Sequence, residues 1–365
     1  MFADAAFCIS KHQISVKNTP PIRTFSSKSL HNPNKCLTFA ALEPAKPLND
    51  AQMSGSFFLL AMTTKIPFSK SYTEESSLIA LLQSRGLSIT DESKAHHYLT
   101  HIGYYRLSAY MYPLLYTPKE QHIYKKGATF DKVMMLYRFD KKLRLLLFNE
   151  IEKIEVAVRS AVVKHGCEVI GDTFWMTNPS NFSNPVKFSK TLHLIDDELN
   201  HSKEDFITHF KDTYSDPYPP AWMLSEILPL GVITNIYSNI KNKKIKKRIS
   251  QSFNLQIAPF ESWMTIVTLT RNACCHHARV WNKAYTIRAT MPNQFLRPWI
   301  TLPTDQLRIY FNMCIIKYFL DIISPGNDML SKMQSLFAEH PEVDLRALGF
   351  PSGNWQDEPL WSTQS

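Results

Sequence analysis

Glycine is scarce in this chain, at 10 of 365 residues. The sequence contains neither G-x-x-x-x-G-K-[ST] nor G-x-G-x-x-G, so it does not support a phosphate-binding loop or a dinucleotide-binding fold. Long hydrophobic runs are missing too. The longest near the N-terminus, 57–62, is far shorter than the roughly 18–20 residues of a membrane-spanning helix. We therefore expect no membrane attachment.

Cysteine is also rare. The six cysteines are Cys8, Cys36, Cys167, Cys274, Cys275 and Cys314. Six in so long a chain do not form a disulfide framework, and two of them are adjacent, which is poor geometry for a bridge between them. The first twenty residues lack the apolar core of a signal peptide. The sequence predicts a reduced, cytoplasmic protein.

The composition otherwise suits a globular protein with a basic bias. Hydrophobic residues make up 44%, and 41 basic against 32 acidic residues give a net charge of +9. This balance allows a polyanionic partner such as nucleic acid. Residues 1–61 differ from the rest because Ser, Thr, Asn and Pro are scattered without a period. We expect this leader to be disordered, or absent because translation starts at Met53 or Met62.

From residue 67 onward the hydrophobic pattern is mostly helical, which predicts an all-α fold. We expect a 62–128 helical segment, a 129–291 core and a 292–365 C-terminal segment. A capping box at Ser71 opens the first helix, and a break near Asp140 interrupts the long periodic stretch. The expected helices are 71–85, 91–101, 129–169, 189–212, 221–240, 257–283, 306–323 and 329–340. Pro292 and Pro298 end the helical pattern of the segment 257–283.

The densest cluster of reactive side chains spans residues 271–282, with the sequence RNACCHHARVWN. A zinc site is one interpretation, but adjacent Cys and adjacent His point to different helix faces, and no C-x-x-C pair exists. Core packing is a second interpretation. The third is phosphodiester chemistry, because histidine titrates near neutral pH and can move the protons of RNA cleavage. A guanidinium suits the charge that gathers on the phosphoryl oxygens. We expect no metal or other cofactor.

Arg271-x4-His276 resembles the R-x(4–6)-H signature of HEPN ribonucleases. The wider pattern is similar to the Abi-like (abortive infection, AbiD/AbiF type) family. The matching motifs are Arg271-Asn-x-Cys-x-His-His-x-Arg-x-Trp-Asn282, Ile102-Gly-Tyr-Tyr-Arg-Leu-Ser-Ala-Tyr110, Asp140-x3-Arg144, Ile151-Glu-x-Ile-Glu-Val-x-x-Arg159, Pro219-Pro-x-Trp-Met223, His340-Pro-Glu and Ala347-Leu-Gly-Phe-Pro351. The resemblance covers about residues 67–361. One departure is Cys275, where the pattern has alanine.

The resemblance implies a helical bundle of HEPN type that acts as a metal-independent endoribonuclease in phage defence or a toxin–antitoxin system. It also implies a homodimer, and a small regulatory RNA or antitoxin as a further partner. Arg271 and His276 would be catalytic, with Asn272 orienting His276 or the phosphate. The product would carry a 2′,3′-cyclic phosphate. The alternative function is a non-catalytic RNA-binding regulator with the same fold.

Several other residues are secondary candidates. His277 and Arg279 suit leaving-group protonation and RNA contact, or a structural role at the helix end. Arg159-x5-His165 suits a second HEPN half, or an ordinary helix edge.

Glu152 and Glu155 share a helix face, and Glu155 suits either an ion pair with Arg159 or the orientation of a catalytic group. The segment 241–248 is a candidate RNA-binding site or a solvated helix end. Its candidate contacts are Lys243, Lys244, Lys246, Lys247 and Arg248.

Overall fold

The computed structural model describes residues 67–68 and 71–362. The expected leader, with its alternative starts, lies outside these residues. Within the described part the chain forms twelve α-helices and no β-strand, which confirms the all-α fold class. Of the described helices, none has both the length and the apolar character needed to cross a membrane.

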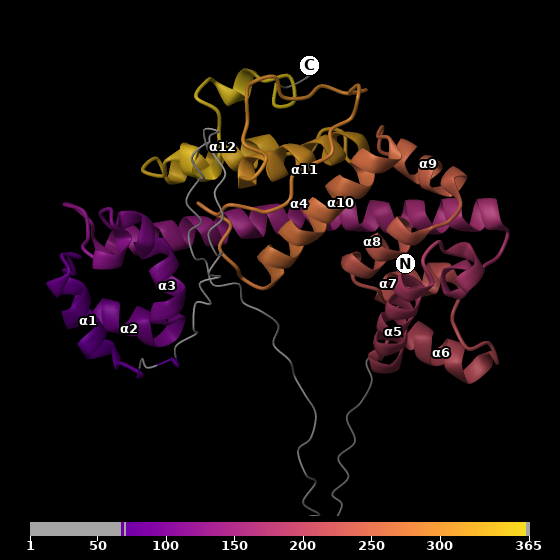
Figure 1. Cartoon of the computed structure of the whole chain (residues 1–365), viewed down its shortest axis with the longest axis horizontal. Helices are drawn as coiled ribbons and strands as arrows, with labels where there is room; N and C mark the ends of the chain where they lie inside the picture. The colour runs from indigo at the N-terminus through magenta and orange to yellow at the C-terminus, as the bar shows by residue number, and fades with distance from the viewer. Residues whose placement is uncertain (1–66, 69–70, 363–365) are drawn as a thin grey trace, which may run out of the picture. The chain divides into compact units, whose positions relative to one another are not determined.

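All twelve helices belong to one compact unit, Lys70–Ser365 (Figure 1). They are α1 (Glu75–Ser84), α2 (Glu92–Ile102), α3 (Tyr104–Met111), α4 (Phe130–Ile170), α5 (Pro185–His201), α6 (Asp205–Thr213), α7 (Ala221–Ile227), α8 (Leu230–Asn239), α9 (Lys243–Gln251), α10 (Ile257–Cys275), α11 (Ile309–Ile323) and α12 (Met329–Glu339).

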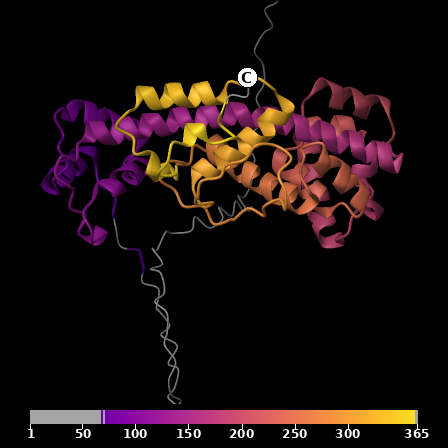
Figure 2. The same cartoon turned by 90° about the horizontal axis from the view of Figure 1, so that it is seen from above.

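Helix α4 is the element on which the others assemble. It has 41 residues, about 60 Å at 1.5 Å per residue. The Thr129 side chain caps its first turn by accepting a hydrogen bond from the Lys132 amide, and Gly171 ends it in the left-handed conformation. Helices α3, α7, α8, α9, α10, α11 and α12 all pack on α4 (Figures 1 and 2). A helix this long is stable because neighbours cover it along its whole length.

The core lies between α4, α10 and α11. Helix α11 is apolar on nearly all sides and is buried almost completely, as expected for a helix that other elements surround. Trp263 of α10 stacks on Trp299 and meets Tyr318 of α11 edge-on. These rings fix how α10 lies against α11, and so fix the direction in which the C-terminal end of α10 points.

The predicted break near Asp140 is wrong, because α4 runs through this position without interruption. Asp140 is fully buried, and its carboxylate pairs with Arg144 one turn further along the same helix. A charged residue within a helical hydrophobic pattern suggests an exposed position or a helix break. Asp140 is instead stabilised inside the core by buried partners on other segments.

Other boundaries also differ from expectation. The predicted capping box at Ser71 is wrong, since α1 begins at Glu75. Segment 189–212 divides into α5 and α6, and Pro229 divides 221–240 into α7 and α8. The last helix of the core ends at Cys275, long before Pro292. The proposed domain boundaries stay predictions.

Candidate functional site

Residues from three separate motifs meet at the Asp140 carboxylate. Tyr110 of α3 donates its hydroxyl to Oδ2 at 2.6 Å, and Arg144 of α4 pairs with the same oxygen. The backbone amides of Val280 and Trp281 donate to Oδ1 at 3.1 and 2.7 Å. We call these five residues the Asp140 cluster. It joins α3, α4 and the segment after α10.

The Asp140 cluster is closed to solvent. Burial raises the pKa of the Asp140 carboxyl, while Arg144 and the hydrogen bonds from Tyr110, Trp281 and Val280 oppose that rise. Burial also raises the pKa of the Tyr110 hydroxyl above its ordinary value. Because both oxygens of the carboxylate are engaged and buried, we assign the cluster a structural role.

Helix α10 ends within the reactive motif. Cys275 is its last residue, His276 is the C-cap, and His277 adopts the left-handed conformation with φ 55°. The amide of Ala278 bonds the Ala273 carbonyl, and that of His277 bonds the Cys274 carbonyl, which is the Schellman arrangement. The helix ends here because the amides of this turn donate hydrogen bonds to carbonyls of its last turn.

Two arginines anchor this turn to α3. Arg106 donates to the His277 carbonyl at 2.7 Å, and Arg279 donates to the Ala109 carbonyl at 2.7 Å. Burial lowers the pKa of Arg279. These contacts favour the structural interpretation of Arg279 and of the His277 backbone. The His276 and His277 side chains remain exposed.

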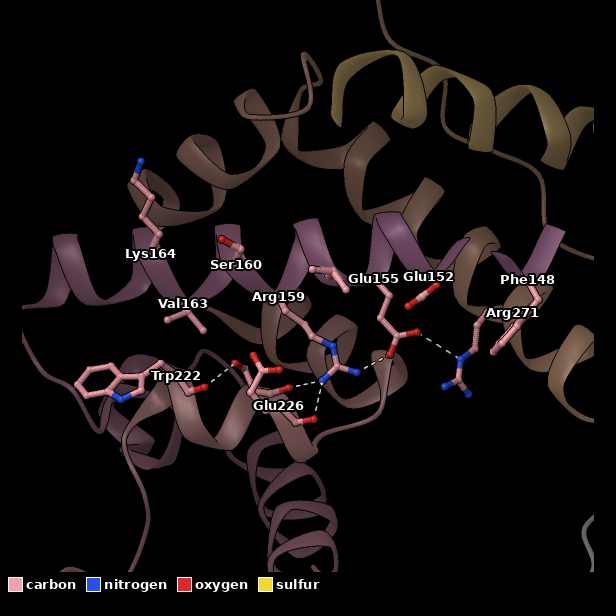
Figure 3. Close-up of a pocket in the computed structure, with 12 residues that line it drawn as sticks. Phe148, Glu152, Glu155, Arg159, Ser160, Val163, Lys164, Trp222, Glu226 and Arg271 are labelled. Carbon is pink, nitrogen blue, oxygen red and sulfur yellow. Dashed lines mark hydrogen bonds and ion pairs between the residues drawn. The ribbon is translucent and has the colours of Figure 1, made fainter. Parts of the chain in front are cut away.

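A pocket of about 560 Å³ lies between α4, α7 and α10 (Figure 3). Its lining residues are Phe148, Glu152, Glu155, Val156, Arg159, Ser160, Val163, Lys164, Trp222, Ser225, Glu226 and Arg271. Four of the sequence candidates, Glu152, Glu155, Arg159 and Arg271, therefore share one cavity. In Figure 3, Trp222 and Arg271 lie at opposite ends of it.

Glu155 links two arginines inside this pocket. One of its oxygens pairs with Arg159, and the other lies 3.4 Å from Nε of Arg271. That second contact has the distance of an ion pair without hydrogen-bond geometry, since Nε of Arg271 is buried without a hydrogen-bond partner among the described residues. The Arg271 guanidinium lies 6.0 Å from the centre of the Phe148 ring. Its two terminal nitrogens form no hydrogen bond or ion pair within the described chain, and Arg271 lines the pocket (Figure 3).

Arg159, in contrast, is fully engaged. It donates to the backbone carbonyls of Ser225 and Glu226 and pairs with Glu155. These contacts tie α4 to the end of α7. They favour a structural role for Arg159, and they leave Arg271 as the guanidinium available to an anionic ligand.

His276 does not line the pocket that contains Arg271. Its amide bonds the Asn272 carbonyl at 2.9 Å, but within the described residues the two side chains form no hydrogen bond. A single chain therefore places the two predicted catalytic side chains at the same end of α10 without joining them in one cavity.

The comparison with known families agrees with the motifs that meet in this region. A model described as Abi-like protein matches residues 97–282, half of the chain. The chain belongs to the Abi-like protein family. This confirms the resemblance over the matched segment, which excludes the C-terminal motifs at 340–342 and 347–351. No curated protein and no solved structure matches the chain.

The remaining candidates of this Abi-like chain lie away from the pocket. His165 is held by Ser252 at 3.0 Å and by Glu168 at 3.3 Å. Lys246 points inward, where it bonds the Ser238 carbonyl and pairs with Glu261. The other four basic candidates, Lys243, Lys244, Lys247 and Arg248, are exposed on α9.

Sequence reasoning missed the α7 side of the pocket. Trp222 belongs to a motif that supported the family resemblance, yet it had no predicted role. The only sequence signal was the spacing of Trp222 and Glu226; in the structure both are exposed, while Ala221, Leu224 and Ser225 form the buried face of α7. Residues four apart on a helix share a face, so Trp222 and Glu226 project together.

Proposed function

We propose that this Abi-like chain is a metal-independent endoribonuclease of a phage-defence or toxin–antitoxin system. The observation that carries the proposal is Arg271, whose terminal nitrogens have no partner among residues 67–68 and 71–362 and which lines an open pocket, followed by the exposed His276 at the end of the same helix. An always-charged, forked cation is suited to hold a phosphodiester.

The chemistry follows from these two groups. The imidazole of His276 takes the proton of a ribose 2′-hydroxyl, and the resulting oxygen attacks the adjacent phosphorus. The Arg271 guanidinium stabilises the negative charge that develops on the phosphoryl oxygens. The bond to the 5′-oxygen breaks, and that oxygen is protonated. The products are a 2′,3′-cyclic phosphate and a 5′-hydroxyl. DNA has no 2′-hydroxyl and is not a substrate.

The active form in this proposal is a homodimer. His276 of one copy meets Arg271 of the other across a two-fold axis, which overcomes their separation within one chain. The exposed apolar residues Leu145 and Phe148 on α4, of which Phe148 lies beside Arg271, supply the contact with the second copy. The exposed basic residues of α9 contact the RNA backbone, and a small RNA or antitoxin restrains the enzyme.

The test uses the purified full-length protein with end-labelled single-stranded RNA in EDTA. We expect cleavage with cyclic-phosphate ends, loss of cleavage in His276→Ala, and no loss in His193→Ala, an exposed histidine on α5. RNA that is retained uncut, with retention unchanged in His276→Ala, would instead identify a non-catalytic RNA-binding regulator.

Mixing two inactive variants tests the composite cleft. A heterodimer of Arg271→Ala and His276→Ala contains one intact cleft and one doubly altered cleft. Random mixing should then restore up to about one quarter of the wild-type activity. If the catalytic cleft forms within one chain, the mixture stays inactive.

A further inference from the structure

The pocket beyond Arg271 has a composition that suits nucleobases better than phosphates. Its α4 wall presents Glu152, Val156 and Val163 along one helical face, and its α7 wall presents Trp222 and Glu226. Trp222 is 49% exposed, although tryptophan is among the most apolar side chains available for packing. A large aromatic ring left open at a pocket wall is a surface on which an unstacked base can stack.

The charges in the pocket support the same conclusion. Its lining has three basic and three acidic side chains, so it lacks the positive potential that a row of phosphates needs. Glu155 is occupied by its two arginines. The carboxylates of Glu152 and Glu226 form no hydrogen bond or ion pair within the described residues, and both are exposed at the pocket. Free carboxylates repel phosphates but accept hydrogen bonds from the amino groups of bases.

The size of the pocket is compatible with more than one base. From Phe148, next to Arg271, to Val163 at the other end, α4 rises by about 22 Å. One phosphate at Arg271 therefore leaves room for bases toward Trp222. A duplex does not fit this arrangement, because its bases are stacked on each other and their pairing edges are occupied.

We propose that this pocket is a base-reading subsite for single-stranded RNA. One base stacks on Trp222, while Glu226 and Glu152 accept hydrogen bonds from exocyclic amino groups of the bases. The subsite prefers cytosine to uracil, because cytosine has an amino donor where uracil has a carbonyl acceptor that a carboxylate repels. This inference rests on the proposed function, since it places the bound strand next to the phosphate at Arg271.

Binding is measured separately from cleavage, by fluorescence anisotropy of labelled 12-nucleotide oligo(C) and oligo(U) on full-length protein carrying His276→Ala. We expect tighter binding of oligo(C). In that background, Trp222→Ala should weaken oligo(C) binding roughly tenfold to a hundredfold, and Trp222→Phe should retain most of the affinity. Tyr214→Ala is the matched control, because Tyr214 is 54% exposed and does not line the pocket.

The carboxylate is tested with Glu226→Gln, which should reduce the preference for oligo(C), since an amide donates as well as accepts hydrogen bonds. Glu120→Gln, exposed and outside the pocket, should leave the preference unchanged. Equal binding of oligo(C) and oligo(U), or a Trp222→Ala variant with unaltered melting temperature that binds as Tyr214→Ala does, would overturn the subsite.

Failure of the nuclease proposal looks different. If that proposal fails, the wild-type protein leaves RNA intact, while binding still depends on Trp222 and on the identity of the base. Conversely, cleavage with an unchanged KM in Trp222→Ala would overturn the subsite and leave the nuclease standing.

Discussion

The Asp140 cluster and the pocket lie along the same helix, and residues of the family motifs build both, yet they differ in how far their polar groups are satisfied. In the Asp140 cluster both carboxylate oxygens have partners, and the Asp140 side chain is fully buried. In the pocket the Arg271 terminal nitrogens and two glutamates have none within the described chain. Polar groups that are buried and paired hold helices together, whereas polar groups left open are available to a ligand.

The largest effect should come from breaking the Asp140 cluster. Asp140→Asn leaves the buried Arg144 without its counter-charge and replaces one acceptor oxygen by an NH2 group that faces donors, and we expect a loss of about 3–5 kcal/mol in the free energy of unfolding. Thermal and denaturant unfolding measure it. Asp131→Asn is the control, because Asp131 lies on the same helix in an exposed pair with Lys94 and its loss should hardly alter the melting temperature. Equal shifts of the melting temperature in the two variants would contradict the contrast between the buried Asp140 cluster and an exposed ion pair.

The two arginines of the pocket sharpen the comparison within one cavity. Arg271→Ala should reduce RNA cleavage roughly 100- to 1,000-fold with little change in melting temperature, because its guanidinium serves the ligand.

Arg159→Ala should reduce the free energy of unfolding by about 1.5–3 kcal/mol, because it leaves two carbonyls and Glu155 without their donor. Cleavage rates and unfolding curves of both variants provide the check. Our assignment fails if Arg159 proves to be the variant that folds normally and does not cleave.

The smallest effect concerns the two adjacent cysteines. Cys274 is buried beside the Asp140 cluster, and burial raises the pKa of its thiol to about 12, so almost no thiolate exists at pH 8. In a Cys275→Ser variant, iodoacetamide should leave Cys274 unmodified in the folded protein and label it after unfolding. Peptide mapping by mass spectrometry measures this. Rapid labelling of Cys274 in the native state would mean that the cluster is open to solvent.

Some features of the fold could be predicted from local chemistry alone. The limits of α4 follow from Thr129 and Gly171, and those of α2 from Asp91 and Gly103, because a cap and a left-handed glycine act within a few residues. The uninterrupted course of α4 through Asp140 could not be predicted, because the partners of Asp140 come from α3 and from the segment after α10. Nothing near Asp140 in the sequence indicates that they will meet.

The candidate site divides in the same way. The sequence by itself determined the helical class, the family motifs and the choice of Arg271 and His276, since these depend on residue type and spacing. Only the tertiary structure separated the free Arg271 from the engaged Arg159, turned Lys246 inward and placed Trp222 and Glu226 opposite α4. The reason is physical: whether a charge is satisfied depends on which distant backbone and side-chain groups approach it, and packing between helices decides that.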